Sequence, residues 1–302
     1  MAIATRPALE TAAVTSRDGT TIGYRRLGAG PGLVVLHGAM ESSRSHLQLA
    51  EALADAFTVY LPDRRGRGLS GPYPADYSVR TEIDDMAALL SRTGAQYVFG
   101  VSSGAIIWLF AALELPAIRK AAIFEPPLLM DETKSPPLMR RFDEQIAQGK
   151  VAAALITGMK AARLAPPMFD RVPRWLLERL TRAMLASEDN RAAPDDVTMR
   201  MLAPTLHYDF ELVRGSQGAL DRFAAITADV LLLNGTASPA FLQASVDALE
   251  RVLPRAERVR LAGLDHSASG NAADDQHGRL GFIGGKAAFL KSCQQLSVGK
   301  CS

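Results

Sequence analysis

The chain has 302 residues, of which 48% are hydrophobic and 22% are charged, as in ordinary globular proteins and unlike disordered ones. Lysine and arginine number 34 against 32 aspartate and glutamate residues, so the net charge of +2 gives no electrostatic case for a nucleic-acid partner. No stretch reaches the ~18 uncharged apolar residues of a membrane span, and the N-terminus lacks the apolar core of a signal peptide. We therefore expect a soluble, cytoplasmic protein without a membrane partner.

The first part of the chain predicts strands separated by helices. Residues 12–28 indicate a β-hairpin, because Asp18 and Gly19 tolerate the positive φ of its turn. The apolar run at 32–38 is typical of a buried central strand. Further strands are expected within 57–63, 95–100 and 119–125, and helices over 43–55, 81–93 and 105–115.

From about residue 128 to residue 226 the strand pattern stops and proline-punctuated helical stretches dominate. These helices are expected at 137–148, 150–163, 173–186 and 194–202. Strands resume at 228–235 and 257–263, with helices at 240–253 and around 280–294. The simplest layout is an α/β fold with a mostly parallel central sheet flanked by helices. Its core domain would comprise residues 1–127 and 227–302, and a helical cap (lid) domain would comprise residues 128–226.

The central motif is Gly100-Val101-Ser102-Ser103-Gly104, which lies between an apolar strand and an apolar helix. In this context a Gly-x-Ser-x-Gly sequence predicts a tight turn that lifts the serine hydroxyl above the sheet. The turn requires small residues two positions on either side of the serine. The helix that follows favours negative charge at its N-terminus. The alternative is a Gly/Ser turn that only packs within a Rossmann-like sheet.

With this motif and this order of elements, residues from about 14 to 295 resemble the α/β-hydrolase family of serine hydrolases. The resemblance implies that Ser102 is a nucleophile. It also implies an oxyanion hole formed by the backbone N–H of Ser103 and that of Ala39, or of Met40 if the loop turns differently. Residues 63–70 (DRRGRGLS) resemble another family loop, whose arginines we interpret as ties to neighbouring loops rather than a phosphate site.

A serine nucleophile needs a base, and the family's base follows the last core strand. His266 occupies that place, so the resemblance implies that it is the general base. His37 is interpreted as a structural loop residue and His46 as a surface or packing residue. His207 lies in the predicted cap and could face the substrate, and His277 is a weak competitor for the base.

The acid of the triad departs from the family's commonest pattern. Ser238 occupies the usual aspartate position, and a neutral serine cannot stabilise an imidazolium. Glu125 ends the strand at 119–125, where some family members, zearalenone-type lactonases among them, carry their acid. The resemblance therefore implies Glu125, and the alternative is a glutamate that anchors its loop. Asp265 is too close to His266 in sequence to present its carboxylate easily, and Asp131 lies further into the predicted cap.

The expected substrate is a small, fairly hydrophobic carboxylic ester or lactone, cleaved through an acyl-enzyme under a methionine-rich cap. Candidate substrate-binding residues are Met40, Trp175 and His207, although Trp175 could equally pack the cap.

No metal or other cofactor is expected, because H-E-x-x-H is absent and neither cysteine (Cys293, Cys301) lies near a histidine. The alternatives are a C–C bond hydrolase or an acyltransferase on the same triad, and a non-catalytic ligand-binding member. The sequence leaves the oligomeric state open, a homodimer included.

Overall fold

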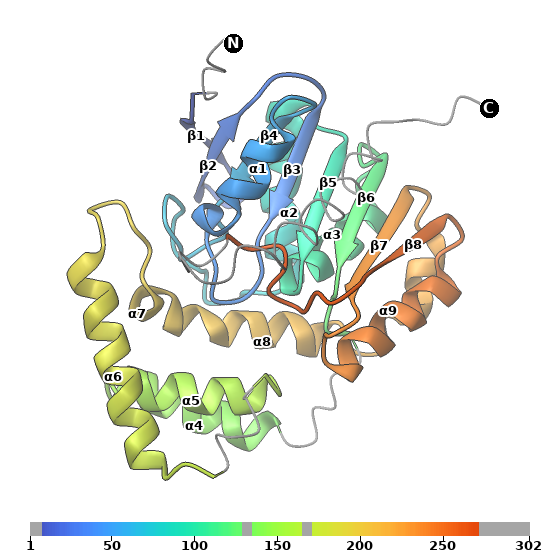
Figure 1. Cartoon of the computed structure of the whole chain (residues 1–302). Coiled ribbons are helices and arrows are strands. Elements are labelled where there is room, and N and C mark those ends of the chain that lie inside the picture. The colour runs from blue at the N-terminus through green and yellow to red at the C-terminus, as the bar shows by residue number, and fades with distance from the viewer. Residues whose placement is uncertain (1–7, 129–134, 165–170, 272–302) are drawn as a thin grey trace, which may run out of the picture.

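A computed structural model describes residues 8–128, 135–164 and 171–271 of the chain (Figure 1). Within them, one eight-stranded sheet has the order β1-β2-β4-β3-β5-β6-β7-β8. The pairs β1–β2 and β2–β4 are antiparallel and the other neighbours are parallel. The strands are β1 Glu10–Thr15, β2 Thr21–Leu27, β3 Gly32–Leu36, β4 Thr58–Pro62, β5 Tyr97–Val101, β6 Lys120–Phe124, β7 Asp229–Gly235 and β8 Ala256–Leu261. The predicted α/β class with its mostly parallel sheet is confirmed.

Apolar side chains cover both faces of this sheet, because successive residues of a strand point to opposite sides. In β3, Val34 and Leu36 join the cluster that includes α2 (Val79–Thr93) and α3 (Ser103–Glu114). The alternate residues Leu33 and Val35 pack with α1 (Leu47–Leu53). A strand buried on both faces reads as a continuous apolar run, which explains why the central strands were predictable.

The helical stretch begins as expected with α4 (Ser135–Ala147), α5 (Val151–Ala161) and α6 (Arg174–Arg191). The prediction of a helix at 194–202 is wrong for the first half of that range, because only α7 (Met199–Leu202) is α-helical there. Helix α8 (Leu206–Gly215) was not predicted. Pro204 lies in the short 3-10 turn Ala203–Thr205 that leads into α8, where a proline is tolerated.

Helix α8 crosses the molecule beside the carboxyl ends of the parallel strands, and α4, α5 and α6 lie farther from the sheet (Figure 1). Helix α9 (Ala240–Val252) packs next to β7 and the chain re-enters the sheet at β8. The boundaries of the cap at residues 128 and 226 stay a prediction. The helix expected around 280–294, His277 and both cysteines lie outside the described residues.

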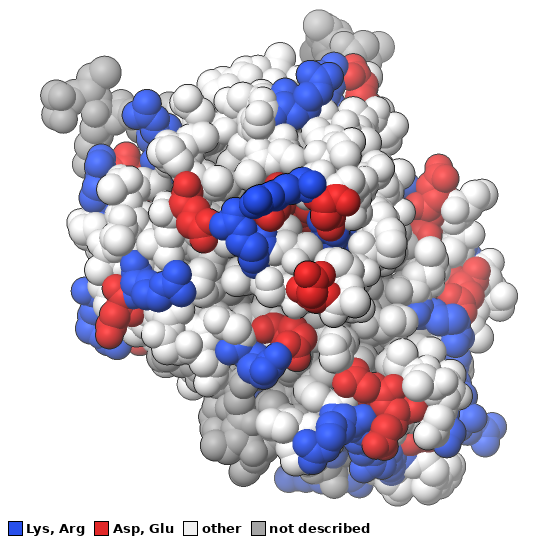
Figure 2. All heavy atoms as spheres, turned by 180° about the vertical axis from the view of Figure 1, so that it is seen from behind, with Lys and Arg blue, Asp and Glu red and all other residues white. Residues whose placement is uncertain are grey.

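Basic and acidic side chains are interspersed on the face opposite to the view of Figure 1 (Figure 2). The described residues on this face do not gather into one extended basic area, which agrees with the near-balanced charge of the whole sequence. In the described part of the chain, no helix combines the length and hydropathy needed to cross a membrane.

Candidate active site

Ser102 lies at the sharp turn between β5 and α3. Its backbone has φ 54° and ψ −120°, a conformation that non-glycine residues rarely adopt and that is typical of functional sites. The Ser102 N–H donates to the carbonyl of Phe124 at the end of β6, over 2.9 Å, which fixes the turn against the sheet. The Ser102 side chain lines a cavity at this edge of the sheet.

The two glycines of the motif are required by close backbone approaches. A Cβ atom on Gly104 would lie 2.5 Å from the carbonyl oxygen of His37, and one on Gly100 would lie 2.7 Å from Cα of Ala105. These contacts involve backbone atoms, which cannot rotate out of the way as a flexible side chain can. The turn can therefore form only with residues that lack a side chain at both positions.

Replacing Gly104 by alanine is expected to destabilise the fold by about 1–3 kcal/mol, the usual cost of forcing an extra methyl group into a packed interior. The free energy of unfolding in urea measures this. Gly215→Ala is the control, because a Cβ at Gly215 meets nothing within 4 Å and the residue ends α8. An equal loss of stability in both variants would contradict the steric argument.

His266 and Glu125 are in direct contact although 141 residues separate them in the sequence. His266 Nδ1 donates to Glu125 Oε2 over 2.7 Å, and the carboxylate is fully buried at the end of β6. The other oxygen, Oε1, accepts the N–H of Gly235 at 2.7 Å. A proton on Nδ1 leaves the Nε2 lone pair available, and His266 lines the same cavity as Ser102.

Among the described residues, neither Asp265 nor Ser238 forms a hydrogen bond with His266. Asp265 accepts the N–H and the hydroxyl of Ser267, so its carboxylate is engaged within its own loop. Ser238 is buried, and its hydroxyl has no hydrogen-bond partner among the described residues. Asp131 lies outside the described residues.

The loop that follows β3 lies beside the serine. Ala39 and Ser103 both line the cavity, as expected of two oxyanion donors. Ser103 is the first residue of α3, where backbone N–H groups lack intrahelical acceptors. Met40 has a positive φ of 57°, and the N–H of Gly38 is taken up by the carboxylate of Glu41 at 2.7 Å. Gly38 is therefore not an oxyanion donor.

The rest of the cavity wall is largely apolar and comes mainly from α8, α9 and the residues after β6 and α5. These wall residues are Pro127, Ala162, Leu164, Leu206, Phe210, Val213, Phe241 and Leu242. A cavity with such walls suits a substrate with hydrophobic groups around its reacting carbonyl.

Three predicted substrate-binding residues are not brought to this cavity. Trp175 is 65% exposed on α6. His207 pairs with Asp143 of α4 at 3.0 Å and lines a separate hollow between α4 and α8. Met40 packs against core residues instead. Two of these residues, Trp175 and His207, were expected from their place in the predicted cap, which does not determine the direction in which a helix presents its side chains.

Two arginines of the loop after β4 pair with Asp209 of α8, which also lines the cavity. The Asp209 carboxylate accepts hydrogen bonds from Arg64 at 2.7 Å, from Arg67 at 2.6 Å and from the hydroxyl of Ser103 at 2.8 Å. Arg64 also pairs with buried Glu82 at 2.8 Å. Burial alone would raise the pKa of the Asp209 carboxyl, but Arg67 and Arg64 lower it more, so this pKa lies below its ordinary value. Asp209 is therefore a charged residue that links α8 to the turn after the serine.

Asp209 is a residue that the sequence analysis missed. The signal was the spacing of Leu206, Phe210 and Val213, which puts apolar residues on one face of a helix. All three are buried, and Asp209 is buried beside them at 3% exposure. Recognising that helix would have placed a carboxylate on its inner face.

Replacing Asp209 by asparagine is expected to lower the free energy of unfolding by about 3–5 kcal/mol, because it leaves buried arginine charge uncompensated. Urea unfolding measures the loss. The double variant Asp209→Asn/Arg67→Met should recover part of it, since the unpaired charge is also removed. If the effects of the two substitutions simply added, the assignment of a buried ion pair between Asp209 and Arg67 would be contradicted.

The pH dependence of stability follows from the same carboxyl. The pKa of Asp209 is lower in the folded protein than in the unfolded chain. Its contribution to the free energy of unfolding is therefore present above pH 3.8, the ordinary aspartate pKa, and is lost as the pH falls through the lower folded pKa.

The remaining charged residues of the 63–70 loop have structural contacts too. Arg25 pairs with Asp63 at 3.1 Å, and Arg65 pairs with Asp18 and Asp85, both at 2.6 Å. Most of these side chains are buried, so they hold the loop in place, as the sequence interpretation proposed. His, Cys, Asp and Glu side chains of the described residues form no group of three or more that could hold a metal ion.

His37 lies inside this network. Burial lowers the pKa of its imidazole well below the ordinary value, and the charges of Arg67 and Arg64 lower it further. The neutral ring accepts the N–H of Arg64 at Nε2 over 3.1 Å. His37 is therefore a structural residue of its loop.

Comparison with known proteins places this geometry in a family. Residues 33–276 match the model of the alpha/beta hydrolase family. The crystal structure of an alpha/beta hydrolase from Sphaerobacter thermophilus is 31% identical and has a TM-score of 0.72, with 93% of this chain and 100% of that chain covered.

Two further proteins are similar over different extents. The uncharacterized hydrolase YraK of Bacillus subtilis is 34% identical over 116 residues, which are 37% of this chain and 43% of YraK. The match thus spans less than half of that relative. An enol-lactonase from Burkholderia xenovorans shares the fold at 16% identity, with a TM-score of 0.64 over 94% of this chain and 98% of that chain. From its fold and the extent of these matches, the chain belongs to the alpha/beta hydrolase family.

Proposed function

We propose that this hydrolase cleaves a carboxylic ester or lactone through Ser102, His266 and Glu125. The contact of 2.7 Å between His266 Nδ1 and buried Glu125 Oε2, on the wall of the cavity that Ser102 lines, carries the proposal. A carboxylate in this position holds the imidazole in the tautomer that can accept a proton at Nε2, and it stabilises the imidazolium that results.

The reaction follows from these positions. Ser102 Oγ attacks the carbonyl carbon while His266 Nε2 takes the hydroxyl proton. The N–H groups of Ala39 and Ser103 stabilise the oxyanion of the tetrahedral intermediate, and the N-terminus of α3 favours the same charge. Collapse of the intermediate expels the alcohol, which receives its proton from His266. A water molecule then attacks the acyl-enzyme with His266 as base, and Ser102 is regenerated.

We infer the substrate class from the residues that line the cavity. The side chains that line the cavity are mostly apolar, and the negative charge of Asp209, which lines it as well, is offset by two arginines. A hydrophobic ester or lactone fits such a wall better than a charged substrate, because a charged group would lose its hydration without gaining a partner. The enol-lactonase that shares the fold is named for a lactone substrate, which is in line with the lactone alternative.

A fluorophosphonate probe tests the nucleophile, and a panel of p-nitrophenyl esters and γ- and δ-lactones tests the substrate class. Intact mass and peptide mapping should show one adduct, on Ser102, and turnover should increase with acyl-chain length until the cavity is filled. Product analysis separates ester hydrolysis from C–C cleavage and from acyl transfer to a second alcohol. A protein that binds hydrophobic ligands but shows neither adduct nor turnover would be a non-catalytic member.

A further inference from the structure

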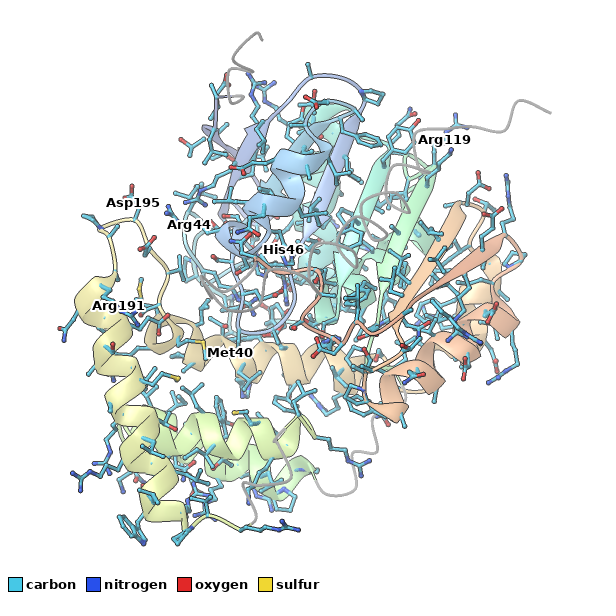
Figure 3. The ribbon with its side chains drawn as sticks, viewed as in Figure 1. Met40, Arg44, His46, Arg119, Arg191 and Asp195 are labelled. Atoms are coloured by element: carbon cyan, nitrogen blue, oxygen red, sulfur yellow. The ribbon has the colours of Figure 1, made fainter. Side chains whose placement is uncertain are left out.

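A second pair of titratable residues, outside the proposed triad, joins the last residue of the oxyanion loop (residues 37–41) to the segment before α1. Glu41 Oε2 accepts the N–H of Gly38 at 2.7 Å and lies 3.2 Å from His46 Nε2. His46 is fully buried, and its Nδ1 lies 2.9 Å from the carbonyl oxygen of Ser269. His46 points from the segment before α1 toward the loop that carries the proposed base (Figure 3).

The hydrogen bonds of this pair require one extra proton. The carbonyl oxygen of Ser269 can only accept, so His46 Nδ1 must carry a hydrogen. A neutral imidazole would then turn the Nε2 lone pair toward the oxygen of Glu41, and two acceptors would face each other. Either His46 Nε2 or the Glu41 carboxyl therefore carries a further proton.

The surroundings place that proton on His46. Burial raises the pKa of the Glu41 carboxyl, but the charge of His46, the hydrogen bonds from His46 and Gly38 and the nearby His266 lower it more. The net pKa of Glu41 lies below its ordinary value, and the backbone N–H of Gly38, which donates to Oε2 at 2.7 Å, favours the carboxylate independently of His46. His46 then donates from both ring nitrogens, as an imidazolium.

The two loops that this pair joins hold opposite parts of the proposed active site. Arg67 donates to the carbonyl oxygens of Gly38 at 2.8 Å and Glu41 at 3.3 Å, which supports the oxyanion loop from one side. On the other side, the backbone N–H of Asn271 donates to Ser45 O at 2.8 Å. The segment before α1 is thus attached to the loop after β8, and His46 lies within this attachment.

We propose that Glu41 and His46 form a buried carboxylate–imidazolium bridge that holds the oxyanion loop against the loop carrying His266, so that Glu41 is a positioning residue for acyl transfer. The inference rests on the proposed function. Glu41 fixes Gly38, the residue before the oxyanion donor Ala39, and His46 transmits that constraint to the loop of the general base. Loss of the bridge displaces a donor that acts mainly in the transition state, so it lowers kcat and changes KM little.

The variants Glu41→Gln and Glu41→Asp separate charge from shape. Glutamine matches the size of glutamate but carries no negative charge to stabilise an imidazolium, whereas aspartate is shorter but keeps the charge. We expect kcat to fall about 10–100-fold in Glu41→Gln, less than the ~10²–10³-fold loss that follows complete removal of an oxyanion donor, and to fall less in Glu41→Asp. A residue that only filled space would give the reverse order. Glu10→Gln is the control, because Glu10 lies exposed on β1 and pairs with Arg26.

Imidazole nitrogen NMR of the full chain reads the bridge without relying on activity, with His46 assigned by its loss in His46→Gln. We expect both ring nitrogens of His46 to be protonated at pH 7, and one of them to lose its proton in Glu41→Gln. A singly protonated His46 in the wild type, or wild-type kcat in Glu41→Gln, would overturn the proposal. If the wild type neither reacts with fluorophosphonate nor turns over esters, the proposed function fails and the positioning role falls with it, while NMR still decides whether the bridge exists.

Discussion

Replacing Ser102 by alanine is expected to abolish labelling by the fluorophosphonate probe and to lower kcat by a factor on the order of 10⁶, the loss that follows removal of the nucleophile from a comparable triad. The expected loss is large because no covalent intermediate can form without the hydroxyl at the turn. Residual turnover would come from the oxyanion donors and from substrate binding alone. Intact mass after labelling and kcat on the best ester or lactone are the two measurements.

The neighbouring Ser103 provides a matched control. Its hydroxyl donates to Asp209 and accepts from Arg64 at 3.1 Å, so it is engaged away from His266. Ser103→Ala should therefore still be labelled, and the adduct should map to Ser102. An adduct on Ser103, or full labelling of Ser102→Ala, would show that the nucleophile has been assigned to the wrong residue.

Replacing Glu125 by glutamine is expected to lower kcat by about 10⁴-fold, as found when the acid of a triad is changed to its amide. Glutamine can donate to His266 Nδ1 and thereby favour the tautomer that carries its proton on Nε2. That tautomer cannot accept the serine proton, and the imidazolium loses its counter-charge. Steady-state kinetics at neutral pH give the loss, and circular dichroism checks that the variant is folded.

Two further variants test whether Glu125 acts through His266. The double variant Glu125→Gln/His266→Ala should be no worse than His266→Ala alone, because residues of one catalytic unit are strongly non-additive. Ser238→Ala, at the family's usual acid position, should keep wild-type activity, because its hydroxyl contacts no partner among the described residues. If Ser238→Ala lost as much activity as Glu125→Gln, the acid would have to be sought in the loop after β7.

Features that depend on local sequence could be predicted. The apolar runs of the central strands and the glycines around Ser102 are dictated by burial and by steric contacts of neighbouring backbone. The proximity of Glu125 to His266 was expected because some members of the resembled family carry their acid at the end of this strand, and the structure brings the two side chains together. The chemical roles of these residues stay predictions.

Features that depend on distant contacts could not be predicted. Arg64 and Arg67 are paired with Asp209 across 145 and 142 residues, and nothing in the loop after β4 indicates which helix holds the partner. His46 was interpreted as a surface or packing residue because it lies on a predicted helix, yet its hydrogen bond to Ser269 spans 223 residues. Such pairs are set by the packing of whole elements.

Directed evolution of this protein for heat tolerance will meet a conflict at two positions. Ser102 and Glu125 both have positive φ although they are not glycines. Such backbone conformations cost about 1–3 kcal/mol each, and glycine would relieve that cost. A library selected for survival at high temperature alone would therefore enrich substitutions that remove the proposed nucleophile and acid. Turnover has to be selected together with thermal survival in every round.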